Sequence, residues 1–392
     1  MNRNGLLLCL ISSLALAACH ASEGPATSTT KSAPEKTAVE PAKPANREAD
    51  DAARFLAGMP GREGSAYKAL ESQKAWIDHA RQMDEAWAGF EKRRKAGMTK
   101  FQQAELVGAP VDGSPIWYPF SGGDALTMLV FFPGHTTYSM AALEPPGRIP
   151  TAAQFEKLDL GKELPQIAST LSSLLGKSFF VTREMDRQLR GQVTDGVAEP
   201  MLILLARLGY QINGYQYVQL DENGKLVPRG VDTQRAAFGR NRGLSLDIER
   251  AGEKPATLVY ISLNLDDAHM KDNPAFKTYV AGLGKSCTLL KSTSYMMHSD
   301  GFKLIRQMVL DDSALIIQDD SGVPWKYFTP EHWQVQLYGD YVSPFGADFQ
   351  FRTQKDLRAA YEAQRKDVKP MAFRMGYGAG KIESNLQVAR RK

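Results

Sequence analysis

Apolar residues between positions 66 and 96 recur at intervals of three, four or seven, which is the spacing of one face of an α-helix. This stripe consists of Leu70, Ile77, Ala80, Met83, Trp87 and Phe90. Charged residues lie off the stripe, and His79 falls among them, where we expect it to be solvated. The pattern predicts one long amphipathic helix over 66–96, and Gly97 is a suitable residue to end it.

The C-terminal half of the chain alternates between short apolar runs and helical patterns. The runs predict strands at 256–265, 287–292 and 313–318, and the helical patterns lie at 274–282 and 301–310. A β-α-β-α-β order indicates parallel strands joined by helical crossovers. Upstream, Asn223-Gly224 follows a strand pattern and predicts a hairpin, so antiparallel strands are expected on the same or an adjoining sheet.

The apolar segment 124–132 is compatible with a buried helix or a buried strand, because it is apolar all round. Asp124 would cap the helix in the first case. Taken together, the patterns predict an α/β or α+β fold. Its mixed sheet would contain the β-α-β-α-β portion and would be preceded in the chain by the long amphipathic helix.

The N-terminus carries a short apolar segment of a different kind. Arg3 precedes a run of 14 uncharged residues from Gly5 to Ala18. A positive start followed by a short apolar run is typical of a secretory signal peptide, and the run is shorter than the roughly 20 residues of a membrane span. No second apolar run approaches that length.

The run ends in Leu16-Ala17-Ala18-Cys19, which resembles the lipobox of bacterial lipoproteins. The resemblance implies cleavage before Cys19 and acylation of this cysteine, with palmitate among the acyl groups. It also implies attachment to a membrane through the lipid. His20 follows the cysteine where an Asp would retain a lipoprotein in the inner membrane. We therefore expect an outer-membrane lipoprotein that faces the periplasm, with an inner-membrane or surface-exposed position left open.

Composition divides the chain further. The segment after Cys19 contains several prolines and no aromatic residue up to position 50, which predicts a disordered tether. The resulting division is a signal peptide at 1–18, a lipidated cysteine and tether at 19–50, a helical segment at 51–110, an α/β domain at 111–370 and a basic tail at 371–392.

Charge and cysteine content exclude several classes of function. The formal net charge of +4 over 392 residues gives no basic field of the kind that nucleic-acid binding requires. After removal of Cys9 with the signal and acylation of Cys19, only Cys287 remains, in an apolar stretch where we expect it to be buried. Metal-binding spacings such as His-Glu-x-x-His and Cys-x-x-Cys do not occur, so we expect neither a metal nor a cofactor.

Polar residues follow the three strands of the β-α-β-α-β portion. They are Asp266, Asp267 and His269 after the first strand, Tyr295 and His298 after the second, and Asp319 and Asp320 after the third. If the strands are neighbours, these side chains share one edge of the sheet and could perform acid–base chemistry or hold a divalent cation. The alternative is that Asp and similar residues only form turns and helix starts there.

Aromatic residues are concentrated near the C-terminus. Residues 325–351 hold nine of the 36 aromatics of the chain, which is a density that could mark a glycan-binding surface. Trp325, Trp333 and Tyr338 are the candidates for stacking on sugar rings. The alternative is that these side chains fill the core and follow strand propensity.

Two functions follow from these observations. The first is a lipid-anchored, periplasm-facing lipoprotein with a non-catalytic domain for binding or envelope assembly, whose partner is an envelope protein or a glycan. The alternative is a periplasmic hydrolase that uses the carboxylates and histidines at the sheet edge. Convergence of those side chains in one pocket would favour the hydrolase.

Overall fold

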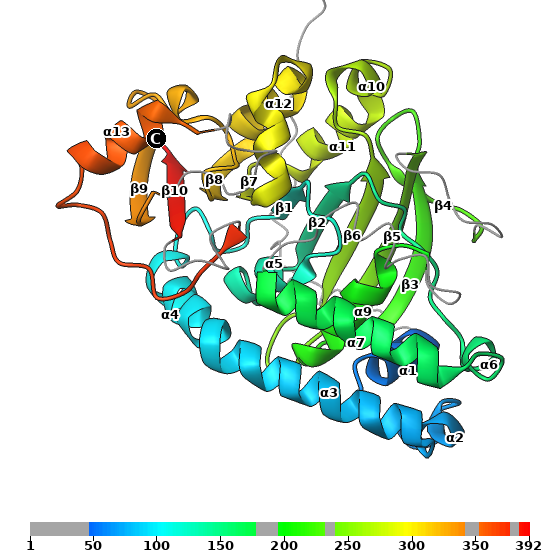
Figure 1. The fold of residues 1–392 in the computed structure, drawn as a ribbon. Helices are drawn as coiled ribbons and strands as arrows, with labels where there is room; N and C mark the ends of the chain where they lie inside the picture. Colours follow the sequence, from blue (N-terminus) through cyan, green and yellow to red (C-terminus); the bar gives the residue numbers. More distant parts are fainter. Residues whose placement is uncertain (1–46, 178–194, 232–239, 342–352, 377–383) are drawn as a thin grey trace, which may run out of the picture. The chain divides into compact units, whose positions relative to one another are not determined.

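The computed structural model describes residues 47–176 with the backbone of 177, and residues 195–231, 240–341, 353–376 and 384–392. The signal peptide, Cys19 and most of the expected tether lie outside these ranges. No helix in these ranges combines the length and the apolar character that crossing a membrane requires. A ten-stranded sheet runs through the described part in the order β4-β3-β5-β6-β2-β1-β7-β8-β10-β9 (Figure 1). The strands are β1 (Ile116–Pro119), β2 (Thr137–Ala142), β3 (Gln211–Leu220), β4 (Leu226–Pro228), β5 (Arg240–Glu249), β6 (Ala256–Leu263), β7 (Ser286–Leu290), β8 (Ser313–Gln318), β9 (Trp333–Gly339) and β10 (Asn385–Arg391).

The five central strands, β6-β2-β1-β7-β8, are parallel, and the strands outside them are antiparallel to their neighbours. The sheet is therefore mixed, as the sequence predicts. Along the chain the parallel strands begin at the centre with β1, extend to one side through β2 and β6, and then continue on the other side with β7 and β8. The direction of strand addition thus reverses between β1 and β7.

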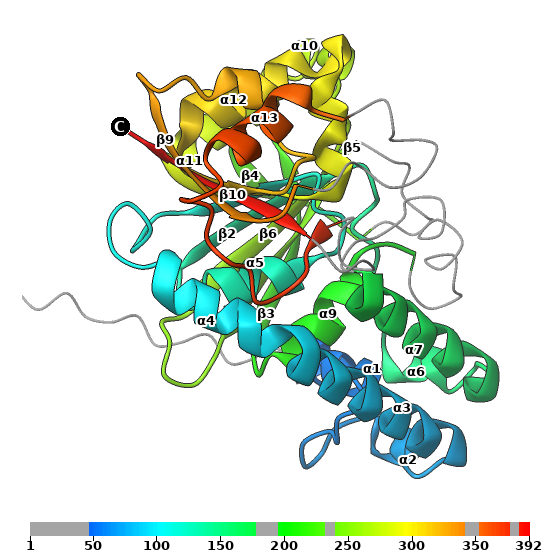
Figure 2. The same cartoon turned by 60° about the vertical axis from the view of Figure 1, so that its left-hand side comes forward.

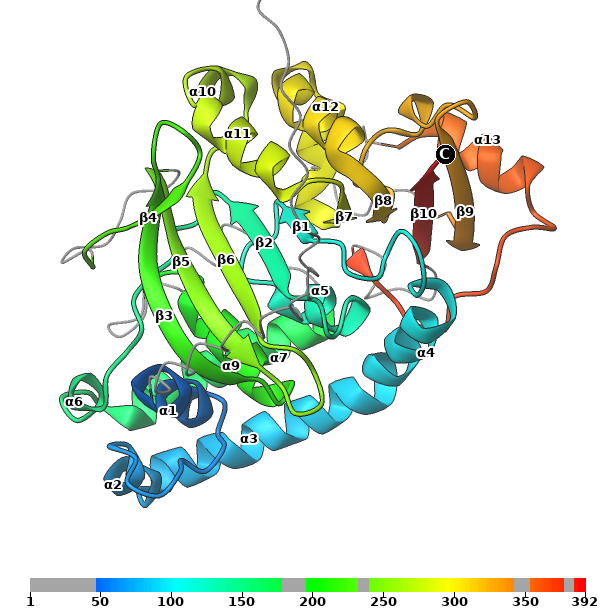
Figure 3. The same cartoon turned by 180° about the vertical axis from the view of Figure 1, so that it is seen from behind.

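Helices cover both faces of the sheet. The helices are α1 (Arg47–Leu56), α2 (Lys68–Glu71), α3 (Lys74–Phe90), α4 (Ala96–Glu105), α5 (Ala125–Phe131), α6 (Ala152–Phe155), α7 (Leu160–Lys177), α9 (Ala198–Arg207), α10 (Asp267–Lys271), α11 (Pro274–Leu283), α12 (Lys303–Asp312) and α13 (Lys355–Ala363). Side chains of α1, α3, α4, α5, α7 and α9 pack with Ile116 and Tyr118 in one core. Side chains of α10, α11 and α12 pack with Trp117 in a second core. Alternate residues of a strand point to opposite faces, so these cores lie on the two sides of the sheet (Figures 1 and 3).

The β-α-β-α-β portion is present as β6-α11-β7-α12-β8, with the short helix α10 before α11. The segment left open between helix and strand is helix α5, and Asp124 caps it by accepting a hydrogen bond of 3.2 Å from the Thr127 backbone N–H. The hairpin predicted at Asn223-Gly224 joins β3 to β4. Gly224 has a φ of 74°, which is the left-handed conformation that such a turn favours.

The long N-terminal helix differs from the prediction at both ends. The helical segment is interrupted after α2, so the long helix α3 begins only at Lys74. The chain then stays helical past Gly97 to Glu105 through a π-helical turn, η1 (Glu91–Lys95). Gly97 does not end the helix. It allows the Ala372 backbone to approach the helix closely, because a Cβ at position 97 would lie 2.6 Å from the Ala372 carbonyl oxygen.

The apolar stripe of this helix is buried at its C-terminal part, where α3 packs against α7 (Figure 2). Ile77 on the same stripe is 54% exposed, so the stripe is not covered along its whole length. The expectation for His79 was wrong, since it is 2% exposed and hydrogen-bonds the Leu56 carbonyl oxygen at 2.8 Å. Helical spacing alone placed His79 off the stripe, but the C-terminal end of α1 lies beside that side of α3.

Two segment boundaries also change. The predicted tether at 19–50 extends too far, because α1 begins at Arg47 and the side chain of Ala49 is fully buried. The predicted basic tail at 371–392 ends in strand β10, which lies between β8 and β9 and is antiparallel to both (Figure 3). Val388 and Ala389 within β10 are fully buried, so the basic residues Arg390 and Arg391 end a strand instead of forming a tail.

Candidate functional site

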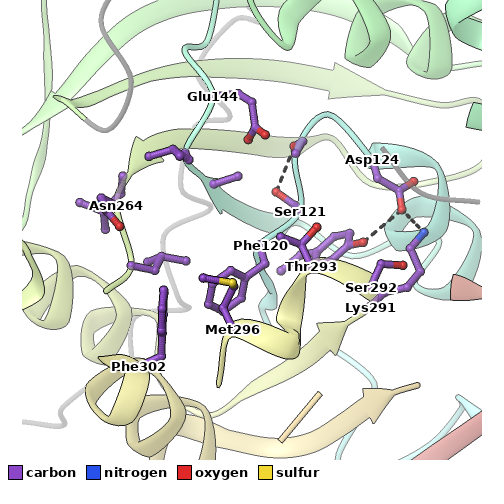
Figure 4. A pocket seen from close by; sticks show the side chains of 16 residues that line it. Phe120, Ser121, Asp124, Glu144, Asn264, Lys291, Ser292, Thr293, Met296 and Phe302 are labelled. Carbon is purple, nitrogen blue, oxygen red and sulfur yellow. Dashed lines mark hydrogen bonds and ion pairs between the residues drawn. The ribbon is translucent and has the colours of Figure 1, made fainter. Parts of the chain in front are cut away.

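A cavity of about 240 Å³ lies at the carboxyl ends of four parallel strands, β1, β2, β6 and β7 (Figure 4). Tyr118 belongs to β1, Ala142 to β2 and Leu263 to β6, and the other lining residues come from the segments that follow these strands and β7. The lining residues are Tyr118, Phe120, Ser121, Gly122, Asp124, Ala142, Leu143, Glu144, Leu263, Asn264, Leu265, Lys291, Ser292, Thr293, Met296 and Phe302.

The place of this cavity follows from the order of the strands. The chain leaves β1 toward β2 and leaves β7 toward β8, so the two segments diverge from neighbouring strands. In open sheets with parallel strands, ligands bind in the crevice that forms at such a reversal. The segment after β1 and the segment after β7 supply nine of the sixteen lining residues, which are 120–122, 124, 291–293, 296 and 302.

The polar wall of the cavity contains a buried ion pair. Lys291, after β7, donates to Asp124, after β1, so the pair joins the two diverging segments. Their side chains are only 2% and 3% exposed. Asp124 also accepts a hydrogen bond of 3.1 Å from the Tyr118 hydroxyl, and Lys291 donates one of 2.9 Å to the Thr127 hydroxyl. Burial lowers the pKa of Lys291, although the negative charge of Asp124 opposes this effect. The two charges therefore neutralise each other inside the protein.

Two residues with strained backbones face this cavity. Among the described residues, three that are not glycine have positive φ, and two of them, Phe120 and Ser292, line the cavity with φ of 61° each. Such conformations cost about 1–3 kcal/mol and are concentrated at functional sites. The Ser292 backbone N–H is held by the Asp319 carboxylate at 3.3 Å.

The Ser292 side chain has unused hydrogen-bonding capacity. Ser292 is 2% exposed, and its Oγ has no hydrogen-bond partner among the described residues. By contrast, the Ser121 hydroxyl, which lines the same cavity, donates to the Gly122 carbonyl oxygen at 3.1 Å. The Ser292 hydroxyl is thus a buried polar group of the cavity wall whose hydrogen-bonding capacity is not used by the described residues.

The opposite wall is apolar. Phe120, Leu263, Leu265, Met296 and Phe302 line it, and Figure 4 shows Phe302 and Met296 on the side away from Lys291. Met296 is 39% exposed and Leu143 is 41% exposed, so apolar side chains reach the surface beside the cavity. The cavity therefore offers apolar contact on one side and hydrogen-bonding groups on the other.

The seven predicted acid–base residues do not form one site, and none of them is among the lining residues of the cavity. The prediction assumed that the three strands are neighbours. β7 and β8 are neighbours, whereas β2 and β1 separate β6 from β7. The residues after β6 therefore lie apart from those after β7 and β8.

The group after β6 has local structural roles, and within it Asp266 and Asp267 are half-buried while His269 is exposed. Asp266 caps α10 by accepting a hydrogen bond of 2.9 Å from the His269 backbone N–H, and the His269 ring lies 2.8 Å from the same carboxylate. Asp267 accepts a hydrogen bond of 2.8 Å from the Leu304 backbone N–H at the start of α12. These contacts agree with the alternative interpretation of turns and helix starts.

The group after β7 and β8 does come together, in the interior. The Tyr295 hydroxyl donates to Asp320, and the Asn385 side-chain amide donates to the same carboxylate at 3.1 Å. His298 hydrogen-bonds the Gly322 carbonyl oxygen at 2.9 Å and packs edge-on against Tyr295. Among the described residues, no cluster of three or more His, Cys, Asp or Glu side chains is placed to hold a metal ion.

Burial perturbs the carboxylates of this cluster. It raises the pKa of Asp320 from 3.8 to about 7, and the neighbouring charge of Asp319 adds to the increase. Burial raises the pKa of Asp319 as well, although hydrogen bonds from Ser321 and Ser292 oppose it. Asp320, whose pKa is about 7, thus directly follows Asp319, whose carboxylate holds the Ser292 backbone.

The three aromatic binding candidates do not form an exposed platform. Trp333 is 5% exposed and Tyr338 is 1% exposed, so both are core residues. The Tyr338 hydroxyl donates to Glu105 at 2.6 Å, and Trp325 is partly buried against Phe328. Phe345, Phe349 and Phe351 of the same run lie outside the described residues.

Sequence reasoning missed Lys291 and Ser292. It assigned 287–292 to a strand, whereas β7 ends at Leu290 and these two residues turn away from the sheet. Cys287 was interpreted correctly, because it is fully buried in β7 and burial raises the pKa of its thiol to about 12.

Comparison of the chain with protein-family models, with curated proteins and with solved structures finds no significant match. The functional interpretation therefore depends on the geometry of the cavity and on the N-terminal sequence.

The buried ion pair allows a test of how the cavity wall is held together. We expect Lys291→Met to destabilise the protein by about 3 kcal/mol, because it leaves the Asp124 charge buried without a partner. Asp124→Asn keeps a side chain that can cap α5, but it removes the partner of Lys291. The double variant should lose less stability than the sum of the two single variants, as measured by urea unfolding. Additive losses would contradict the coupling.

The raised pKa of Asp320 predicts a pH-dependent stability. The folded protein retains the proton of Asp320 up to about pH 7, whereas the unfolded chain releases it near pH 3.8. The contribution of this group to stability is therefore complete below about pH 4 and is lost as the pH rises to about 7. Asp320→Asn should show a smaller decrease in urea midpoint over this range than the wild type.

Asp300→Asn is the matched control, because the Asp300 side chain is 95% exposed. It should follow the wild-type pH profile. An Asp320→Asn profile equal to that of the wild type would show that Asp320 ionises normally in the folded protein.

Proposed function

We propose that this protein is a lipid-anchored lipoprotein of the bacterial envelope whose folded domain binds a small, largely apolar ligand without catalysing a reaction on it. The anchor part of the proposal is supported by Leu16-Ala17-Ala18-Cys19, which resembles a lipobox, and by the apolar run before it. His20 in place of Asp favours the outer membrane, with the domain facing the periplasm.

The observation that carries the binding part is the cavity between the segments after β1 and β7. It occupies the position where open sheets with parallel strands bind ligands, and it has an apolar wall with a few convergent polar groups. Two strained residues, Phe120 and Ser292, face it. Retained strain at a concave site supports a function for that site.

The composition of the cavity favours binding over catalysis. Its lining residues in the described part of the chain include no histidine, and Lys291 and Asp124 are occupied with each other. The Ser292 hydroxyl is nearly fully buried, and among the described residues no general base hydrogen-bonds its Oγ, so the cavity lacks an activated nucleophile at this position. The hydrolase alternative relied on a single carboxylate and histidine site, and its candidate residues belong to two separate groups.

The chemistry of the wall also bears on the partner. Sugars are recognised by exposed aromatic rings and many hydrogen bonds, and Trp333 and Tyr338 are buried. The cavity instead resembles a site for an acyl or alkyl chain, with Phe120, Met296 and Phe302 as contacts. We therefore favour a small apolar ligand over a glycan, and over an envelope protein as the occupant of this cavity.

The proposed anchor predicts a specific pattern of acylation. Cells that express the full chain and receive an alkynyl palmitate should label the protein and retain it in the membrane fraction. Cys19→Ala should lose both the label and the membrane retention, because acyl chains are the proposed means of attachment. Cys9→Ala and Cys287→Ala are controls that should keep both. Labelling of the Cys19→Ala protein would contradict the anchor.

The proposed ligand site predicts that filling the cavity abolishes binding. We expect native mass spectrometry to detect a bound small molecule on the full chain, made without membranes and incubated with an envelope lipid extract. Ala142→Met places a longer side chain in the cavity and should remove the bound mass. Ala363→Met adds the same side chain at an exposed position of α13 and should keep it. No bound mass, or equal masses on all three proteins, would refute the ligand site.

A further inference from the structure

We infer that the ligand of the cavity is an uncharged amphiphile, with an alkyl or acyl chain against the apolar wall and a neutral polar group hydrogen-bonded to Ser292 Oγ. This inference rests on the proposed function and makes it more specific, since it names the polar chemistry that the cavity selects.

The first argument is that the described residues of the cavity wall include no unpaired cationic side chain to bind an anionic ligand. Lys291 is the only cationic side chain among the lining residues of the described chain, and Asp124 already neutralises it. An anionic ligand would have to enter without a counter-ion or take Lys291 from Asp124, which would leave a buried carboxylate unpaired. Both alternatives are unfavourable in a low-dielectric site.

The same reasoning applies to a cationic ligand. Asp124 is held by Lys291, by the Tyr118 hydroxyl and by the capping hydrogen bond from Thr127. The third charged lining residue, Glu144, also interacts with neighbouring groups of the protein. Binding of a cation would require one of these existing interactions to be exchanged. A neutral ligand requires no such exchange.

The second argument is the Ser292 hydroxyl itself. It is the lining side-chain group that is both nearly fully buried and without a partner in the described structure. A buried hydroxyl without a hydrogen bond is unfavourable, and a neutral donor or acceptor on the ligand would satisfy it. The hydrogen bond from the Ser292 backbone N–H to Asp319 fixes the strained turn, so the hydroxyl is held in place before the ligand binds.

The third argument is size. A volume of about 240 Å³ is below the usual range for drug-sized ligands, which begins near 300 Å³. The cavity therefore accommodates a chain of medium length, or the end of a longer chain that continues past the exposed Met296 and Leu143. Eight-carbon compounds are suitable probes because they share the same carbon skeleton and carry a small head group that is neutral in 1-octanol, negative in octanoate and positive in octylammonium.

The test is isothermal titration of the full chain, made without membranes, with 1-octanol, octanoate and octylammonium. We expect 1-octanol to bind at least about tenfold more tightly than either charged compound, because burial of an unpaired charge is costly. Ser292→Ala should weaken 1-octanol binding about fivefold, which is the effect of losing one neutral hydrogen bond. Ser72→Ala is the control and should leave the affinity unchanged, because Ser72 is an exposed serine outside the cavity whose hydroxyl donates to the Ala69 carbonyl oxygen.

Ser292→Gly is a second variant that guards against misfolding, since glycine accepts a φ of 61° without strain. It should weaken 1-octanol binding as Ser292→Ala does. Octanoate or octylammonium binding as tightly as 1-octanol, or unchanged affinity in both Ser292 variants, would overturn this inference while the ligand site stands. If all three compounds bind the Ala142→Met protein as they bind the wild type, the proposed function itself fails.

Discussion

The buried ion pair between Lys291 and Asp124 connects the two halves of the sheet at the point where the strand order reverses. Lys291 follows β7, and Asp124 follows β1 and caps α5. β1 and β7 are paired parallel strands, and the ion pair adds an attraction between the two segments at the point where they diverge. Because Asp124 also binds Tyr118 and Lys291 also binds Thr127, removal of one charge would disturb a helix cap and the cavity wall together.

Internal neutralisation has a consequence for recognition. Charged side chains in a cavity normally select charged ligands, but here the charges are used to hold the cavity together. In the proposed site the selectivity depends on the apolar wall and on the Ser292 hydroxyl, which has no partner among the described residues. Ser292 and Phe120 retain positive φ on facing segments, so the local strain and the binding groups belong to the same residues.

The fold was largely predictable from the sequence, and the site was not, for related physical reasons. Periodicity depends on neighbours in the chain, so it located β6, β7 and β8 and the helices between them. It carries no information on which strands pair, and the insertion of β2 and β1 between β6 and β7 separated Asp266, Asp267 and His269 from Tyr295 and Asp320. Adjacent β7 and β8 did bring Tyr295 to Asp320, as the sequence reasoning required.

Other misses have the same origin. Gly97 has the character of a helix end, and only the approach of Ala372 from 275 positions further along the chain explains why glycine lies within the helix. The strand β10 was interpreted as a tail because the basic residues Arg390 and Arg391 at its C-terminal end suggested exposure. Val388 and Ala389 before them are nevertheless fully buried. Likewise, a lysine after a strand is usually solvated, and only the position of Asp124 beside it makes Lys291 a buried residue.

Asp319 physically connects the cavity to the carboxylate cluster that the sequence analysis singled out. Its carboxylate accepts the Ser292 backbone N–H and both polar groups of Ser321, while the adjacent Asp320 binds Tyr295 and Asn385. The acidic residues after β8 therefore act from behind the cavity, by fixing the turn that presents Ser292. Burial raises the pKa of Asp320 to about 7 and the charge of Asp319 adds to this increase, so protonation of Asp320 is linked to the residue that holds the turn. Asp319, which was expected to perform acid–base chemistry, is thus better explained as a residue that fixes the turn beside the cavity, whereas Asp266 and Asp267 hold the starts of helices.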